Sequence, residues 1–455
     1  MPGYAGKFQY SDQGGAVLHQ GPCQFRFDAE TGIVTPAAGT PIAFDLGDVD
    51  RAVSGEWDFS LTLFTGRRLE LRQFGAAFGR MSQELLAAWR DRTVRCLLLE
   101  DLEELGRFSG TAALTGSQEL AGPARLTGTA ALTEPAALAE IRLYRSNLAV
   151  LPLDGPPVQW RLAEVDAVQF DEASYSVTLQ SGGERLVVAR LAQKTDEFRG
   201  KLGDALDALR THQAEALHTT FPFLDPDQLQ RLLEAMPEGR SAPVASLQAI
   251  HPKLPEALIA RTVDARLRPY FDALRARAVG DAWMTGFKFI RPDEEAGADE
   301  DKGAEDGAEQ ASKREPGTPA PATPEPAESP AAQPLFFWFF FPLANGRVAW
   351  EATTGAGRAT YFFDAAAPFF DARAPVEQSI ARLTRGLALV NFRREPVYLP
   401  DDSLERQPRF RRYAIGARKL PELRLLRAAF RGRAIHTSLE AWTAQVDHPQ
   451  SSFTG

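Results

Sequence analysis

The stretch Phe44–Asp50, FDLGDVD, reappears 116 positions later as Trp160–Asp166, WRLAEVD. After each copy, apolar and polar residues alternate as they do in a strand with one buried face. The apolar positions are Phe59, Leu61 and Leu63 in the first copy and Tyr175, Val177 and Leu179 in the second. A repeat of this length with matched alternation indicates that one folding unit occurs twice in the chain.

The residues that follow extend the match. Gly66 and Gly182 stand where each chain must reverse, and glycine supplies the positive φ that a tight hairpin needs. Apolar residues then recur at four-residue spacing, which predicts an amphipathic helix lying on a sheet. These helical positions are Met81, Leu85 and Trp89 in the first copy and Phe198, Leu202, Leu206 and Leu209 in the second.

This order of elements, over roughly residues 8–100 and 137–217, resembles the pleckstrin-homology-like superfold, a bent antiparallel barrel closed by its C-terminal helix. The resemblance implies binding of peptides, proteins or phosphoinositides, not catalysis. It also implies several cations on the first strands of lipid-binding members. Here residues 16–20 and 23–26 are nearly free of cations, and the second copy offers only Arg142 and Arg145, so a protein partner is favoured. The whole chain also resembles a family of bacterial hypothetical proteins to which no activity is attached.

The predicted fold class is α+β: two tandem pleckstrin-homology-like barrels, each capped by a C-terminal helix, then a helical connector and a C-terminal antiparallel sheet with helices. The predicted domains are 1–110 and 137–217 for the two barrels, 218–282 for the connector, 283–291 with 334–455 for the C-terminal domain, and 292–333 for a linker. In the connector, Asp225-Pro226 begins one helix and Ser241–Pro243 another, and Leu254–Ala278 is expected to form a longer helix kinked near Pro269. A helix-turn-helix reader of DNA is the less favoured interpretation, because the region carries few cations.

Residues 292–333 are rich in Glu, Asp, Ala and Pro, with no large apolar residue, and are expected to be disordered. Between Asp293 and Glu328 they carry 12 acidic and 3 basic residues, a net charge of −9 that equals the total for the chain. The flanking stretches Phe287–Ile290, Leu335–Phe341, Arg347–Ala352 and Ala359–Phe363 are expected to form one sheet that the linker interrupts. The aromatic run Phe336–Phe341 suits a central strand better than a membrane-inserting patch. Pro375 then begins a strong helix.

Several classes of function are disfavoured. Two cysteines, Cys23 and Cys96, cannot build a disulfide scaffold or a cysteine metal site; Cys96 is expected to be a buried thiol, with a redox pair as the minority view. No histidine has metal-ligand spacing, and no signal peptide or membrane-spanning run stands out. Gly355–Arg358 imitates a phosphate loop, but a strand follows it, so a hairpin turn is favoured. We expect no cofactor, no metal and no catalytic residue, and a soluble protein of the cytoplasm.

One local feature rises above background. Between Arg406 and Arg433 there are ten basic residues and one acid, Glu422, with aromatic residues interleaved. Guanidinium groups contact phosphate or carboxylate well, and aromatic rings can stack on bases. The candidate anion-binding residues are Arg409, Arg411, Arg412, Arg418, Lys419, Arg424 and Arg427. The competing interpretation is a solvated helical face, since arginine clusters arise easily in so arginine-rich a chain.

The sequence therefore favours a non-enzymatic intracellular scaffold or adaptor that binds protein partners through its tandem units. The first alternative is a protein that binds nucleic acid or another polyanion, such as an anionic surface, through the arginine-rich helices. The second is an enzyme with a dispersed site. The acidic linker could also pair in cis with the basic C-terminal helices.

Overall fold

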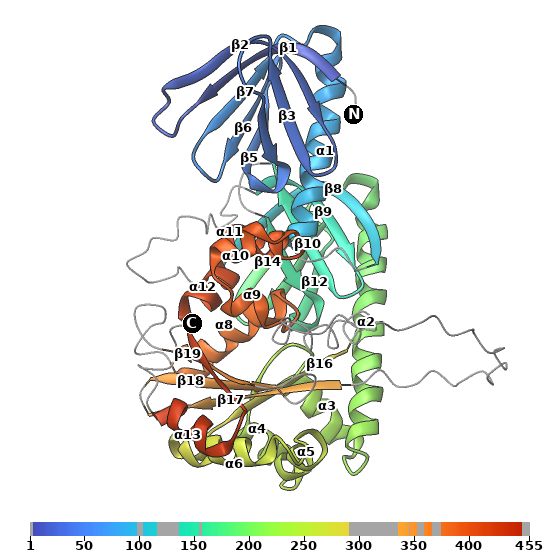
Figure 1. Cartoon of the computed structure of the whole chain (residues 1–455). Coiled ribbons are helices and arrows are strands. Elements are labelled where there is room, and N and C mark those ends of the chain that lie inside the picture. Colours follow the sequence, from blue (N-terminus) through green and yellow to red (C-terminus); the bar gives the residue numbers. More distant parts are fainter. Residues whose placement is uncertain are drawn as a thin grey trace, which may run out of the picture. The chain divides into compact units, whose positions relative to one another are not determined.

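The computed structural model describes residues 3–97, 103–115, 136–153, 157–290, 335–344, 346–352, 359–365 and 375–447. Within these residues the protein is α+β, with two seven-stranded antiparallel sheets, each followed by a long helix, a helical segment, and a six-stranded antiparallel sheet with helices (Figure 1). The predicted fold class is confirmed at this level. The chain divides into two compact units: Met1–Thr211 with Asp364–Phe430, and His212–Phe363 with Arg431–Gly455.

The first sheet has the strand order β4-β3-β2-β1-β7-β6-β5. Its core is formed by one face of the strands and by the buried stripe of helix α1 (Phe78–Cys96), in which Met81, Leu85 and Trp89 are all buried as predicted. A 3₁₀ turn, η1 (Leu46–Asp48), links β4 to β5, and another, η2 (Gly75–Ala77), precedes α1. The strands are β1 (Gly3–Ser11), β2 (Val17–Phe27), β3 (Thr31–Pro36), β4 (Ile42–Asp45), β5 (Val49–Ser54), β6 (Asp58–Leu63) and β7 (Arg68–Arg72).

The second sheet repeats this order as β11-β10-β9-β8-β14-β13-β12, so the predicted duplication is confirmed; one of the two sheets is curled into a half-barrel. The 3₁₀ turns η3 (Leu162–Glu164) and η4 (Ala192–Lys194) stand where η1 and η2 stand in the first copy, and helix α2 (Thr195–Thr220) follows. The strands are β8 (Glu104–Thr115), β9 (Ala137–Tyr144), β10 (Asn147–Pro152), β11 (Val158–Arg161), β12 (Ala167–Asp171), β13 (Ser176–Ser181) and β14 (Glu184–Ala189).

The two copies differ in one hairpin, and there the predicted alignment is wrong. Ser54 faces Phe59 across β5 and β6, whereas the equivalent pair in the second copy is Phe170 and Val177, which are two positions further apart. Phe59 therefore corresponds to Val177, not to Tyr175. Tyr175 lies in the turn with a φ of 49° and an exposed side chain. A slip of two residues preserves the alternation of a strand, so the pattern alone could not detect it.

Strand β8 begins well before residue 137, where the second unit was expected to start. Ala112 of β8 faces Ala137, 25 positions away, whereas the equivalent Phe8 of β1 faces Gly21, 13 positions away. The longer connection breaks the constant offset of the repeat. The predicted domain limits themselves stay predictions.

The corner between the last strand and the helix has the same backbone in both copies. Gln73 and Arg190 have φ values of 60° and 57°, and two residues later Gly75 and Ala192 have φ values of 57° and 51°. These are left-handed conformations, which cost a residue with a Cβ atom about 1–2 kcal/mol. At the second of these positions the first copy has Gly75, which adopts this conformation without strain, whereas the second copy has Ala192.

Exchanging the residues at this corner should change stability in opposite directions. Ala192→Gly should raise the free energy of unfolding by up to about 1 kcal/mol, because it removes the strain at a positive φ. Gly75→Ala should lower it by about 1 kcal/mol, although a Cβ there would meet nothing within 4 Å. Urea unfolding of the full chain measures both values. Changes of the same sign would contradict the shared corner.

Ion pairs join the two copies within the first compact unit. Arg90 of α1 donates to Glu140 of β9 at 3.0 Å, and Arg142 of β9 lies 2.7 Å from Asp91 of α1. Arg142 is buried and also pairs with Glu140 at 2.6 Å. The copies thus share charged contacts between the helix of the first and the sheet of the second.

The third sheet has the order β15-β16-β17-β18-β19-β20. Its strands β16 and β17 pair antiparallel across the long insertion, which confirms the predicted interrupted sheet. Residues 336–342 of β17 are all buried, as expected of a central strand. The strands are β15 (Ala242–Pro243), β16 (Met284–Phe289), β17 (Leu335–Pro342), β18 (Arg347–Ala352), β19 (Ala359–Asp364) and β20 (Phe430–Ile435).

Helices pack on this sheet through a shared core (Figure 1). Asp225 caps the first of them with a reciprocal bond to Gln228, as its sequence predicted. The expected single helix over Leu254–Ala278 is wrong. Two helices occur, separated by a turn in which the Asp264 carboxylate accepts the backbone N–H groups of Arg266 and Leu267. The helices are α3 (Pro226–Ala235), α4 (Val244–Ile250), α5 (Leu254–Thr262), α6 (Arg268–Arg277) and α13 (Leu439–Asp447), with a 3₁₀ turn η5 (Val279–Asp281).

The remaining helices belong to the first compact unit. Helix α8 (Val376–Leu389) follows Pro375 as predicted and buries Ile380, Leu383 and Leu387. The others are α9 (Glu395–Tyr398), α10 (Asp401–Arg406), α11 (Arg411–Lys419) and α12 (Pro421–Ala429), with a 3₁₀ turn η6 (Pro408–Phe410) before α11. Among the described helices, none combines the length and apolar character needed to cross a membrane.

Candidate functional site

The arginine-rich segment singled out by the sequence lies on η6, α11 and α12. Two of its seven candidate cations hold α11 against the first copy. Arg411 Nη2 donates to Asp48 Oδ2 at 2.8 Å, and Arg418 Nη1 donates to Asp48 Oδ1 at 2.6 Å. Both arginines also pair with Glu405 at the end of α10. Asp48 ends η1, so the turn between the two halves of the first sheet receives both guanidinium groups.

Lys419 continues this contact into the interior. Its side chain is buried, its Nζ donates to the carbonyl oxygen of Val49 at 2.7 Å, and it lies over the ring of Phe64 at 4.9 Å. Burial lowers the pKa of Lys419 to about 8, although Cys96, Asp50 and Asp48 favour its charged form. The ammonium group is therefore a structural donor that faces β5, not a surface charge.

The backbone of α11 also approaches α1 closely. A Cβ at Gly416 would lie 2.9 Å from the carbonyl oxygen of Cys96, so only glycine permits this contact. The Cys96 thiol is buried, as the sequence predicted, and burial raises its pKa to about 11. Cys23 is buried as well, and both cysteines are free.

The second copy makes an equivalent contact with α8. Arg385 Nε lies 3.4 Å from Glu164 Oε2, and Arg385 Nη1 lies 3.5 Å from Glu184 Oε1. Glu164 ends η3 as Asp48 ends η1, and the two acids are 116 positions apart in the repeat. The C-terminal helices are thus held at the same acidic turn of both copies.

The other four candidate cations are placed differently. Arg427 Nη2 donates to the Leu399 carbonyl at 2.8 Å and lies 2.6 Å from Asp401 Oδ1. Arg412 donates to the hydroxyl of Tyr413 at 3.0 Å, and Arg409 lies 4.5 Å over the ring of Phe410. Arg424 is half-buried; burial lowers its pKa, and its Nε has no hydrogen-bond partner among the described residues.

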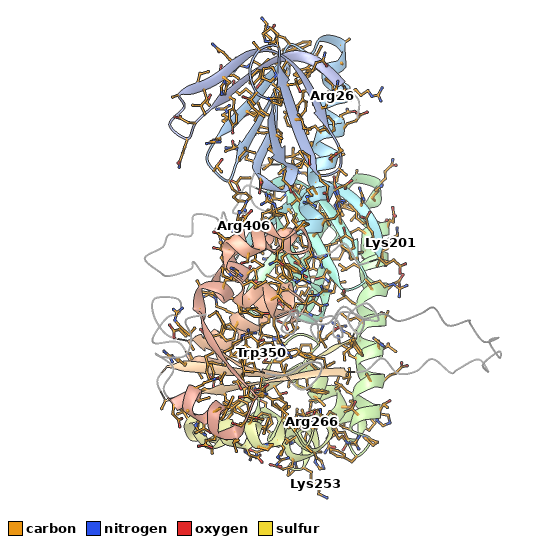
Figure 2. The ribbon with its side chains drawn as sticks, viewed as in Figure 1. Arg26, Lys201, Lys253, Arg266, Trp350 and Arg406 are labelled. Carbon is orange, nitrogen blue, oxygen red and sulfur yellow. The ribbon has the colours of Figure 1, made fainter. Side chains whose placement is uncertain are left out.

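These contacts change how the arginine-rich segment is interpreted. Arg411, Arg418 and Arg427 face carboxylates of the chain itself, and Lys419 faces a carbonyl oxygen, which leaves less positive charge for an external polyanion. The acids responsible lie outside the window counted in the sequence. Glu405 and Asp401 precede Arg406, and Asp48 belongs to the first copy, 363 positions before Arg411. Arg406, outside the seven, is 80 % exposed and pairs with Asp402 at 3.3 Å (Figure 2). The anion-binding role of the segment stays a prediction.

Sequence reasoning missed Asp48 and Glu164 as functional residues, although a signal was present. Both acids occupy the same position of the repeated stretch, which is Phe44–Asp50 in the first copy and Trp160–Asp166 in the second. An acid retained at one place in two diverged copies of one chain points to a shared partner. The sequence does not say which cations supply that partner, since they lie more than 200 positions away.

A buried polar cluster in the second compact unit offers no accessible site. Thr360 Oγ1 donates to Glu351 Oε2 at 2.6 Å and accepts from Trp442 Nε1 at 2.9 Å, and His436 Nε2 lies 3.3 Å from the same Glu351 oxygen. Glu351 and Thr360 are fully buried. The cluster ties β20 and α13 to the sheet. Among the described residues, no group of His, Cys, Asp and Glu could hold a metal ion.

Two predicted features lie outside the described residues: the acidic linker 292–333 and the turn at Gly355–Arg358. Pairing of the linker with the basic helices therefore stays a prediction. Comparison with models of protein families gives no match, and comparison with curated proteins gives none either.

Replacing Lys419 should make the protein more stable at neutral pH. The pKa of Lys419 is about 8 in the folded chain against a usual 10.5, so below pH 8 the fold carries a buried charge at a cost of order 3 kcal/mol. As pH rises from 8 to 10.5, the folded state loses this proton first and stability increases. Lys419→Met should remove the cost, less about 1 kcal/mol for the lost hydrogen bond to Val49.

We expect Lys419→Met to unfold at higher urea concentration than the wild type at pH 7, with the difference shrinking toward pH 10. The two proteins are compared at each pH. Because both contain Cys96, most of the effect of its titration on stability cancels in the difference between them. A variant that is less stable at pH 7 would show that the Lys419 ammonium group stabilises the docking of α11.

Proposed function

We propose that this chain is a non-enzymatic adaptor of the cytoplasm that binds protein partners through two tandem pleckstrin-homology-like units. Support comes from the strand order shared by the two seven-stranded sheets and from the helix that follows each of them. Folds of this kind host many functions, so the arrangement alone does not select one. The choice of an adaptor function therefore rests on the protein segments that the two units hold within this chain.

The observation that carries the proposal is that both copies hold a protein segment at the same place. The turn η1 receives Arg411 and Arg418 of α11, and the equivalent turn η3 receives Arg385 of α8. Charge-assisted hydrogen bonds of this kind provide both geometric specificity and binding energy. The duplicated unit is therefore suited to docking cation-bearing protein segments, and in this chain the C-terminal helices use one such surface on each copy.

Lipid headgroups are less well supported as ligands. Arg142 is buried and paired with Glu140 and Asp91, and Arg145 pairs with Glu103 at 2.6 Å. Neither of these two cations is therefore presented to a phosphate without first breaking an internal pair. Binding of nucleic acid through the arginine-rich helices meets the same obstacle at Arg411 and Arg418.

Purification of the full chain from its native cells, with and without nuclease treatment, separates these functions. An adaptor should retain one defined protein at constant stoichiometry after nuclease treatment and in about 0.3 M salt, where exposed charge pairs are screened. Recovery of nucleic acid alone, with all protein lost after nuclease treatment, would contradict the proposal and favour the polyanion-binding alternative. As a matched control, Arg406→Gln should leave retention unchanged, because this exposed arginine faces only Asp402.

A further inference from the structure

The first copy carries an exposed aromatic side chain that the fold does not use. Six of the seven tryptophans are buried, whereas Trp57 is 69 % exposed. Trp57 lies in the hairpin between β5 and β6. It lines a hollow of about 530 Å³ together with Asp58, Arg72, Gln73, Phe74, Gly75 and Phe78. A large exposed apolar side chain beside a hollow is typical of a binding surface.

The charge around this hollow favours a cation. Glu56 and Asp58 flank Trp57 in the chain and are both exposed. Arg72, the one cation in the lining, is paired with Glu70 of its own strand. Asp58 faces Arg72 across β6 and β7, but Arg72 pairs with Glu70, and Glu56 adds a further carboxylate. A tryptophan face beside an excess of carboxylates attracts a guanidinium or ammonium group through both its quadrupole and the negative charge.

The second copy shows what occupies the equivalent place. Tyr175 precedes Val177 by two positions, as Trp57 precedes Phe59; it is 61 % exposed and follows Asp171 and Glu172 in a hairpin that is two residues longer. Here the chain supplies the cation itself. Arg199 of α2 lies 4.6 Å over the ring of Phe170, and Phe170 meets Tyr175 edge to face at 6.2 Å.

The first copy carries no cation at the position of Arg199. The buried helical stripes align Met81 with Phe198, so the position of Arg199 corresponds to Ser82. Ser82 is buried and donates its hydroxyl to the carbonyl oxygen of Gly79 at 3.1 Å. The hairpin of the second copy therefore has a cation of the chain over one of its aromatic rings, whereas the first copy has Ser82 in place of that cation.

We propose that the hollow at Trp57 binds an arginine- or lysine-bearing segment of a protein partner, with the cation over the Trp57 ring and near the Asp58 carboxylate. This inference rests on the proposed adaptor function and identifies one of its docking surfaces. The first copy already holds cations in this manner elsewhere, since Arg418 and Lys419 lie over Phe64 beside Asp48.

A fluorescein-labelled peptide of alternating arginine and glycine, titrated with the full chain in about 0.1 M salt, tests the proposal by anisotropy. The wild type should bind one peptide, and Trp57→Ala should weaken binding at least tenfold. This variant keeps the net charge, so a general attraction to the acidic chain would leave its affinity unchanged. Equal affinity of wild type and Trp57→Ala, or equal binding of a peptide with glutamine in place of arginine, overturns the proposal.

Two further variants test the equivalence of the copies. Tyr175→Ala should not alter binding, because Arg199 already lies over Phe170, the ring that Tyr175 contacts. Arg199→Ser should raise the stoichiometry from one peptide to two, and Tyr175→Ala in that background should return it to one. A stoichiometry that stays at one in Arg199→Ser contradicts the argument from the second copy. Both residues are exposed, so the fold should persist, and circular dichroism checks it.

Failure of this inference can be distinguished from failure of the proposed function. If Trp57→Ala still retains the native protein partner and the peptide does not bind, the hollow is not the docking surface and the adaptor function stands. If the peptide binds at Trp57 but no protein partner is recovered from cells, the site stands and the adaptor function is contradicted.

Discussion

The pairing of an acidic turn with arginine side chains governs how the first compact unit is built. Asp48 ends the 3₁₀ turn of the first copy and accepts from Arg411 and Arg418, and Glu164 ends the equivalent turn of the second copy beside Arg385. Each turn sits where the chain passes from one half of a sheet to the other, so its position is fixed by the repeated fold. The C-terminal helices thus contact an equivalent acidic turn on each copy, α11 at Asp48 and α8 at Glu164, although the two copies have only weakly similar sequences.

These contacts also pair several cations of the basic segment with groups of the chain itself. Coulomb attraction favours pairing of Arg411, Arg418 and Arg427 with acids that the fold brings near, and burial of Lys419 removes a fourth charge from the solvent. The pairs of Arg411 and Arg418 with Asp48 are partly buried and resist screening better than exposed pairs. A count of cations along the chain therefore overstates the number of unpaired charges on these helices.

Local patterns predicted much of the fold, since alternation and helical spacing depend on neighbouring residues. The duplication, the cap at Asp225 and the buried central strand at Phe336–Phe341 were all visible in this way. The sequence-based predictions were wrong where the structure depends on contacts between residues that are distant in the sequence or on loop length. A two-residue insertion before Val177 preserved the alternation, a longer hairpin hid β8, and a turn at Asp264 divided one expected helix into two. For the site, the sequence identified the arginines but not Asp48, since tertiary folding alone brings them together.

A double-mutant cycle on Asp48 and Arg418 tests the central claim most directly. Urea unfolding of the wild type, Asp48→Ala, Arg418→Ala and the double variant gives the coupling free energy of the pair. Asp402 and Arg406, which are both about 80 % exposed, provide the reference cycle, expected to give no more than about 0.5 kcal/mol. The account predicts a coupling of at least about 1 kcal/mol for Asp48 and Arg418. A value no larger than that of the exposed reference pair would contradict it.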